Sequence, residues 1–220
     1  MNSYTQDWLD RWQNNQIGFH QNEVNGYLRR HLQRFNLRHG DRVFLPLCGK
    51  SHDLTWLAEQ GYEVIGIELS SIAIETFYRE FKLPYQQFES DRFIQRKSGN
   101  ITLLQGDYFD LRAGDIAGCK LVFDRAALIA MDAANRTRYC AHMRDITAPD
   151  TDMLLVTLDY DQSVMSGPPF AVSAQEVFGH YQEHYEIDQL EQHDVVNEQP
   201  RWRQKGLTRL VETAFQLSPK

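Results

Sequence analysis

Apolar residues along this chain occur in two patterns, short continuous runs and longer stretches with helical spacing. Continuous runs rich in β-branched and aromatic residues predict buried strands. They cover residues 42–47, 63–69, 101–104, 120–124 and 153–158. Helical spacing, supported at residue 70 by a serine cap, predicts helices between these runs. The predicted helices cover residues 25–35, 51–60, 70–81 and about 135–146.

Strands and helices therefore alternate over most of the chain. Alternation of nearly continuous apolar strands with helices is typical of a parallel sheet covered on both faces. The C-terminal part differs, because residues 185–190 and 207–217 alternate apolar and polar side chains as an antiparallel hairpin does. We expect an α/β protein with a doubly wound, mostly parallel seven-stranded sheet that ends in an antiparallel C-terminal hairpin.

The domain organisation is expected to be simple. No repeat, low-complexity tract or Pro/Ser-rich linker interrupts the 220 residues. A chain of this length is within the range of one large domain. We therefore expect a single domain over residues 1–220, in which residues 1–35 form an N-terminal helical extension.

Charge and cysteine content restrict the partners and the compartment. A net charge of -7 argues against nucleic acid or an anionic membrane surface as the main partner. The three cysteines form no CxxC pair, which favours a reducing compartment. With neither an apolar leader nor a run of about 18 apolar residues, a cytoplasmic protein is expected. No exposed heptad or long free strand indicates a partner copy, so a monomer is expected.

Polar residues gather at the ends of the predicted strands, where ligands bind in such sheets. Glu68 follows Gly49 by nineteen residues, close to the spacing of an acidic residue that binds ribose hydroxyls. The alternative is a solvated carboxylate at a strand end. Asp107 is placed to accept from an adenine amino group with Tyr108 beside it, and it is equally well explained as a turn former.

The loop after the first strand contains a single glycine. A dinucleotide-binding loop normally reads G-x-G-x-x-G, and its second glycine lets the backbone approach a pyrophosphate. Here Leu47, Cys48 and Lys50 surround Gly49. Such a loop suits a nucleoside ligand without phosphates. This favours S-adenosylmethionine over NAD, and Cys48 is interpreted as a small packing residue.

The first twenty residues are rich in aromatic side chains. Trp8 and Trp12 are one helical turn apart and share a face. One interpretation is a helix buried on the sheet. The other is that the indole faces contact the cationic sulfonium of the ligand, an interaction of about 0.5–2 kcal/mol. His180 and His184 are expected to be solvated helix positions, and no metal site is predicted.

Six strings together give the chain a specific similarity. They are Trp8-Leu-Asp-Arg-Trp12, Gly18-Phe19-His20, Phe44-Leu-Pro-Leu-Cys-Gly-Lys50, Gly66-Ile-Glu-Leu69, Asp124-Arg125-Ala-Ala-Leu128 and Gly167-Pro-Pro-Phe170. In these strings, in their order and in their spacing, the chain resembles the thiopurine S-methyltransferases from about residue 4 to residue 217. The resemblance implies a class I methyltransferase (Rossmann-like) fold whose N-terminal extension closes over the cofactor, S-adenosyl-L-methionine, which becomes S-adenosyl-L-homocysteine.

The resemblance also implies the residues of the site. Cofactor contacts are expected at Trp8, Trp12, Phe19, Leu47, Gly49, Glu68, Asp107, Tyr108 and Arg125. Substrate contacts are expected at Phe19, Phe170 and Arg201, and Arg125 and Arg201 are the candidates to stabilise a thiolate nucleophile. Arg203 lies two residues from Arg201 and can exchange roles with it. The loop Gly167–Phe170 is alternatively a plain structural loop.

The expected activity is methyl transfer to the sulfur of small aromatic or heterocyclic thiols. One alternative is a methyltransferase that detoxifies selenium or tellurium compounds in the same pocket. The others are a non-catalytic nucleotide-binding module or an NAD-dependent oxidoreductase. The single glycine and the lack of a Tyr-x-x-x-Lys pair count against the oxidoreductase. The natural substrate cannot be predicted from these residues.

Overall fold

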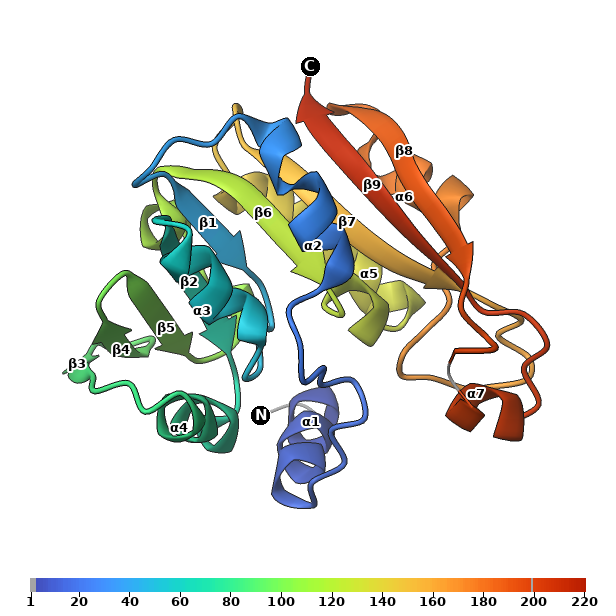
Figure 1. Ribbon diagram of the computed structural model, residues 1–220, viewed down its shortest axis with the longest axis horizontal. Helices are drawn as coiled ribbons and strands as arrows, with labels where there is room; N and C mark the ends of the chain where they lie inside the picture. The colour runs from blue at the N-terminus through green and yellow to red at the C-terminus, as the bar shows by residue number, and fades with distance from the viewer. Residues whose placement is uncertain (1–2, 199) are drawn as a thin grey trace. The chain divides into compact units, whose positions relative to one another are not determined.

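A computed structural model describes residues 3–198 and 200–220 of the chain. Its internal contacts divide the chain into two compact units, Met1–Lys120 and Leu121–Lys220. Figure 1 shows the first unit in blue to green and the second in yellow to red.

The first unit is built on three parallel strands. They are β1 (Arg42–Leu45), β2 (Glu63–Glu68) and β5 (Ile101–Gln105), and β2 pairs with both of the others. Helix α3 (His52–Glu59) joins β1 to β2, and helix α4 (Ser71–Glu80) follows β2; both contact β2 and β5. These elements confirm the predicted strand–helix alternation and place the ends of β1, β2 and β5 at one edge.

Two serines begin the helices that follow the strands. The Ser51 hydroxyl accepts from the backbone N–H of Asp53, and the Ser70 hydroxyl accepts from that of Ala73. Each side chain satisfies a helix N–H that has no partner within the helix. Polypeptide leaving the strand ends is therefore turned directly into a helix.

The N-terminal part of this unit is helical. It contains α1 (Ser3–Gln13), α2 (Gly26–His31) and the 3₁₀ turn η1 (Leu32–Phe35). Asn25 caps α2 by accepting from two backbone N–H groups of its first turn. Helix α1 contacts α4.

A hairpin that the apolar pattern did not predict extends the first unit. Strands β3 (Gln86–Glu89) and β4 (Ile94–Ser98) pair antiparallel, and β4 pairs antiparallel with β5. Within the described residues the chain thus has nine strands, so the predicted count of seven was wrong. All four residues of β3 are exposed, so no buried face marks this strand in the sequence.

The second unit joins two parallel strands to an antiparallel pair. In spatial order these strands are β6 (Cys119–Arg125), β7 (Asp152–Asp159), β9 (Val211–Pro219) and β8 (Tyr185–Asp194). β6 and β7 run parallel, whereas β9 is antiparallel to both β7 and β8. The predicted antiparallel C-terminal hairpin is confirmed (Figure 1).

Helices of the second unit lie before and after the β7 strand. They are α5 (Ala133–Ile146), α6 (Ala174–Tyr181) and the short α7 (Pro200–Gln204). Asp132 caps α5 and Ser173 caps α6. Helices α5 and α6 contact each other, and α6 contacts β8. The long segment from β7 to α6 carries the Gly-Pro-Pro-Phe string.

Candidate active site

The loop after β1 has an irregular backbone that a side chain from β2 holds in place. Leu47 and Gly49 both have positive φ, 46° and 54°. Glu68, at the end of β2, accepts the Gly49 N–H on Oε2 at 2.9 Å and the Ser70 N–H on Oε1 at 2.8 Å. The nineteen-residue spacing between Gly49 and Glu68 therefore corresponds to a direct hydrogen bond.

Glu68 is a buried carboxyl group. Burial raises its pKa to about 7, and the backbone N–H groups of Ser70 and Gly49 lower it less than burial raises it. An ionised carboxylate offers about four lone-pair positions. It can therefore accept from a vicinal diol in addition to its backbone partners, and its ribose contact stays a prediction.

Cys48 lies inside the same loop and serves packing. A Cβ atom on Gly66 of β2 would lie 2.6 Å from the Cys48 Sγ, so the thiol occupies the space that Gly66 leaves. Burial, followed by the nearby Glu68, raises the pKa of the Cys48 thiol. A buried, protonated thiol is a poor nucleophile.

Lys50, in the same loop, forms an ion pair with Glu80. Lys50 Nζ lies 2.7 Å and 2.8 Å from the two carboxylate oxygens of Glu80 at the end of α4. In a phosphate-binding loop the lysine contacts the phosphates instead. This arrangement fits a ligand without phosphates.

Aromatic side chains of the N-terminal segment gather on this loop. Trp8 and Trp12 each meet Phe19 edge to face, with ring centroids 5.6 Å apart. Trp12 is buried, and a Cβ atom on Gly49 would lie 3.2 Å from its indole. The guanidinium of Arg11 lies 5.5 Å from the Trp8 ring centroid, so this ring already accepts a cation. The structure shows the packed cluster, whereas contact of the indole faces with the sulfonium of the ligand stays a prediction.

Asp107 and Tyr108 follow Gly106, the first residue after β5. The Gly106 N–H donates to the Glu68 carbonyl, which places this turn next to the end of β2. Asp107 Oδ1 accepts the Phe109 N–H and caps the 3₁₀ turn η2 (Tyr108–Asp110). The turn-forming role of Asp107 is observed, whereas its adenine contact stays a prediction.

In the second unit, Arg125 ends β6 at a sharp turn. The next residue, Ala126, has a φ of 65°. The turn is held by Asp124, a fully buried carboxyl group that accepts from the Leu128 N–H and the Tyr139 hydroxyl. Burial raises the pKa of Asp124 to about 6. Sequence reasoning identified Arg125 but not the Asp124–Tyr139 pair that supports it.

The loop Gly167–Phe170 is tied to the same turn. The Phe170 N–H donates to the Ile129 carbonyl at 2.7 Å, in the 3₁₀ turn η4 (Leu128–Ala130) that follows Arg125. Gly167 has a φ of +80°, and a Cβ atom there would lie 2.5 Å from the Phe170 ring. Glycine is therefore required at position 167, because the backbone has a positive φ and the Phe170 ring leaves no space for a Cβ atom.

Arg201 lies in the short helix α7 before the last strand. Its guanidinium lies 4.5 Å from the ring centroid of Trp202, and partial burial lowers its pKa. Arg203 donates to the Asn197 side chain at 3.0 Å. The two arginines thus have different surroundings, although their roles towards a substrate stay predictions.

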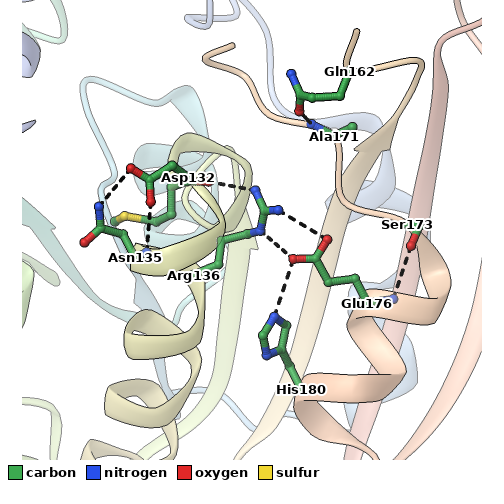
Figure 2. Close-up of polar contacts among 9 residues, drawn as sticks. Asp132, Asn135, Arg136, Gln162, Ala171, Ser173, Glu176 and His180 are labelled. Atoms are coloured by element: carbon green, nitrogen blue, oxygen red, sulfur yellow. Dashed lines mark hydrogen bonds and ion pairs between the residues drawn. The ribbon is translucent and has the colours of Figure 1, made fainter. Parts of the chain in front are cut away.

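A charged network connects α5 to α6, as Figure 2 shows. Arg136 donates from Nε to Glu176 Oε1 at 2.6 Å and from Nη2 to Glu176 Oε2 at 3.3 Å, and its Nη1 donates to the Met131 carbonyl. His180 Nε2 lies 3.5 Å from Glu176 Oε1. His184, expected on a helix, lies in the turn after α6. This network was missed because nothing local in the sequence pairs residues 40 positions apart.

Metal-binding clusters and membrane-spanning helices are both absent from the part of the chain that the structure describes. Over residues 3–198 and 200–220, no group of three or more His, Cys, Asp or Glu side chains is placed to hold a metal ion. Within the same ranges, none of the helices has the length and apolar character needed to cross a membrane.

Solved structures with the same fold define the class of protein. The phosphoethanolamine N-methyltransferase 2 of Haemonchus contortus, in complex with S-adenosyl-L-methionine, matches with a TM-score of 0.67 at 13% identity, over 100% of this chain and 61% of that chain. An arsenic(III) S-adenosylmethionine methyltransferase from Chlamydomonas reinhardtii matches with a TM-score of 0.57 at 17% identity, over 89% and 74%. The fold is that of the class I S-adenosylmethionine-dependent methyltransferases.

Sequence relatives define the family. The family model described as thiopurine S-methyltransferase matches residues 3–220. Proteins named thiopurine S-methyltransferase from Pseudomonas paraeruginosa and Nitrosospira multiformis are 46% and 44% identical, each over 96% of this chain and 96% of theirs. The chain belongs to the thiopurine S-methyltransferase family. It is an S-adenosyl-L-methionine-dependent methyltransferase, and S-adenosyl-L-methionine is its cofactor.

Proposed function

We propose that this enzyme transfers the methyl group of S-adenosyl-L-methionine to the sulfur of small aromatic or heterocyclic thiols. The observation that carries the proposal is the near full-length match to relatives that are themselves named thiopurine S-methyltransferases, at 43–46% identity. Phe170 supports an aromatic acceptor, because its half-buried ring lies on a loop anchored to the turn after Arg125.

The residues of the first unit fit the cofactor. Glu68 presents a carboxylate beside Gly49, and the aromatic cluster of Trp8, Trp12 and Phe19 covers the same loop. We assign cofactor binding to these five residues together with Leu47, Asp107, Tyr108 and Arg125. Contact between Trp12 and Gly49 supports residues 1–35 as a cover for the cofactor. The match of the family model to residues 3–220 supports one methyltransferase domain of residues 1–220.

The chemistry demands little covalent participation from the protein. The cofactor supplies a methyl group bonded to a positively charged sulfur, and the acceptor must present a thiolate in line with that bond. An anion and a cation lose their charges together in this reaction, so a site that excludes water favours it. Trp8, Trp12, Phe19 and Phe170 supply apolar surface for this purpose.

Two arginines are assigned to stabilise the thiolate form of the acceptor. A nearby guanidinium favours the ionised form of the acceptor by opposite-charge attraction, which lowers the pKa of the bound thiol. Arg125 and Arg201 are the proposed contacts, with Phe19 and Phe170 against the acceptor ring. Three free, buried cysteines support a reducing compartment, and we propose a cytoplasmic monomer that acts on small molecules.

The acceptor atom is tested with methyl-labelled cofactor and matched acceptors. Purified full-length protein is incubated with thiophenol, phenol, aniline and benzeneselenol, and with 6-mercaptopurine. We expect label on the sulfur of thiophenol and 6-mercaptopurine. Transfer to phenol or aniline at equal rates contradicts the sulfur preference. A strong preference for the selenol identifies the chalcogen-detoxifying alternative. Binding of NAD without binding of S-adenosylmethionine contradicts the assignment of the protein as a methyltransferase.

Arg201 is tested beside Arg203. In Arg201→Ala we expect the KM for the thiol to rise about tenfold, or the pH optimum to move upward, because the thiolate loses a positive neighbour. The matched control is Arg203→Ala, which removes an arginine from the same helix and is expected to change KM less than about twofold. Unchanged kinetics of Arg201→Ala across the pH range removes Arg201 from the mechanism.

A further inference from the structure

The loop that carries Phe170 has few backbone groups by which it can be held. Pro168 and Pro169 have no N–H, so this stretch offers carbonyl acceptors but no donors until Phe170. The Phe170 N–H is taken by the Ile129 carbonyl. The Val172 N–H donates to the Leu158 carbonyl at 2.7 Å. Between these two bonds, the groups directly before and after Phe170 are the Pro169 carbonyl and the Ala171 N–H.

Both of these groups are bound by one pair of side chains. Tyr160, a buried residue just after β7, donates its hydroxyl to the Pro169 carbonyl at 2.5 Å. Gln162 accepts the Ala171 N–H on Oε1 at 2.7 Å, as Figure 2 shows. The backbone is therefore anchored immediately before and immediately after Phe170.

Gln162 also binds two groups that precede Phe170 in the same loop. Its Nε2 donates to the Tyr160 hydroxyl at 3.0 Å and to the Met165 carbonyl. The single amide of Gln162 therefore binds the backbone after Phe170 through its oxygen. Through its nitrogen it binds the Tyr160 hydroxyl and the Met165 carbonyl. An amide is required, since a carboxylate has no donor, and asparagine is one methylene shorter.

We propose that Gln162 is a positioning residue that sets the affinity for the acceptor by fixing Phe170. It does not touch the reacting atoms in this proposal. The inference rests on the proposed function, in which the Phe170 ring contacts the acceptor. Because the hydrogen bonds of Gln162 within the described residues are to Tyr160, Met165 and Ala171 of this loop, its loss is expected to act on acceptor binding and to leave cofactor binding intact.

The test is a double-mutant cycle on acceptor KM. Gln162→Ala, Phe170→Ala and the double variant are compared with the wild type, with thiophenol as acceptor. We expect each single change to raise KM about tenfold and the double variant to exceed Phe170→Ala by less than about twofold, because residues that act as a unit are not additive. The Kd for S-adenosylhomocysteine, measured by calorimetry, is expected to stay within about twofold in all variants.

Two further variants separate positioning from unfolding. Gln162→Glu keeps the size of the side chain and its acceptor for the Ala171 N–H, but it loses both donors and faces the Met165 carbonyl with an oxygen; its KM is expected to rise as in Gln162→Ala. Ser163→Ala, the matched control, removes a hydroxyl of the same loop that donates only to Asp161. Its KM and cofactor Kd are expected to match the wild type.

The outcomes distinguish this proposal from the proposed function. An unchanged KM in Phe170→Ala overturns the assignment of Phe170 to the acceptor site. A raised KM in Phe170→Ala with an unchanged KM in Gln162→Ala overturns the positioning role alone. Fully multiplicative effects also overturn it, because Gln162 then acts independently of Phe170. A weakened cofactor Kd in both Gln162 variants shows a general structural role and contradicts the proposal.

Discussion

Glu68 lies buried at the end of β2, where burial raises its pKa from 4.5 to about 7. An acid whose pKa is higher in the folded protein binds its proton more tightly when folded. Its contribution to stability is therefore fully present below about pH 4.5 and is lost as the pH rises through about 7. A ribose diol donates hydrogen bonds and so favours the ionised form, which couples ligand binding to the same proton.

This coupling predicts a pH-dependent affinity for the nucleoside part of the cofactor. 5′-Methylthioadenosine is the suitable probe, because it has no α-amino group that titrates near pH 8. We expect its Kd to fall about tenfold between pH 6 and pH 8, as Glu68 loses its proton. Calorimetry at constant ionic strength measures this change.

The matched control for that titration is Glu68→Gln, which keeps the shape of the side chain but cannot ionise. Its Kd is expected to be weaker at pH 8 and nearly independent of pH. A wild-type Kd that stays constant from pH 6 to pH 8 would show that the ribose does not depend on this carboxylate.

Among the helices, α5 and α6 are joined by the bidentate pair of Arg136 and Glu176. The Arg136 side chain is 7% exposed and that of Glu176 is 29% exposed. Removing one member of a buried pair leaves the other charge uncompensated, and the cost depends on how far that charge is from water. The two partners are therefore not equivalent.

This asymmetry predicts different losses of stability. Glu176→Leu leaves Arg136 buried without its carboxylate and is expected to lower the free energy of unfolding by about 3 kcal/mol. Arg136→Met leaves Glu176 with access to water and is expected to cost about 1–2 kcal/mol. Urea unfolding followed by circular dichroism measures both. Equal losses, or a larger loss in Arg136→Met, would contradict this ranking.

Binding of the cofactor product is expected to stabilise the whole molecule. A ligand present at about a hundred times its Kd adds about 2.7 kcal/mol to a protein that binds it only when folded. For a chain of this size, that corresponds to a rise in Tm of about 5–10 °C. Differential scanning fluorimetry with S-adenosylhomocysteine measures the shift.

NAD at the same concentration is the control for this measurement. It contains the same adenosine but also a pyrophosphate, for which the single-glycine loop and the Lys50–Glu80 pair offer no partner lysine. We expect a Tm shift of less than about 1 °C with NAD. Equal shifts with the two ligands would contradict the inference that this loop rejects phosphates.

Much of the fold could be predicted because it is encoded locally. The apolar runs identified β1, β2, β5, β6 and β7, and the serine cap Ser70 marked the start of α4. The Gly49–Glu68 pair was also predictable. A strand, a helix and the next parallel strand form one compact unit, so a fixed spacing along the chain becomes a fixed distance at the strand ends.

By itself, the sequence determined the alternation of parallel strands and helices apart from the β3–β4 hairpin, the antiparallel end of the sheet and the family to which the protein belongs. Only the tertiary structure decided that Trp12 covers Gly49, that Arg136 reaches Glu176 and that Gln162 and Tyr160 anchor the backbone around Phe170. The β3–β4 hairpin also became visible only in the structure, because all four residues of β3 are exposed and give no buried face. Burial of a face repeats with the period of a helix or strand and is visible in the chain, whereas a single polar contact between separate segments has no period and exists only once those segments are packed.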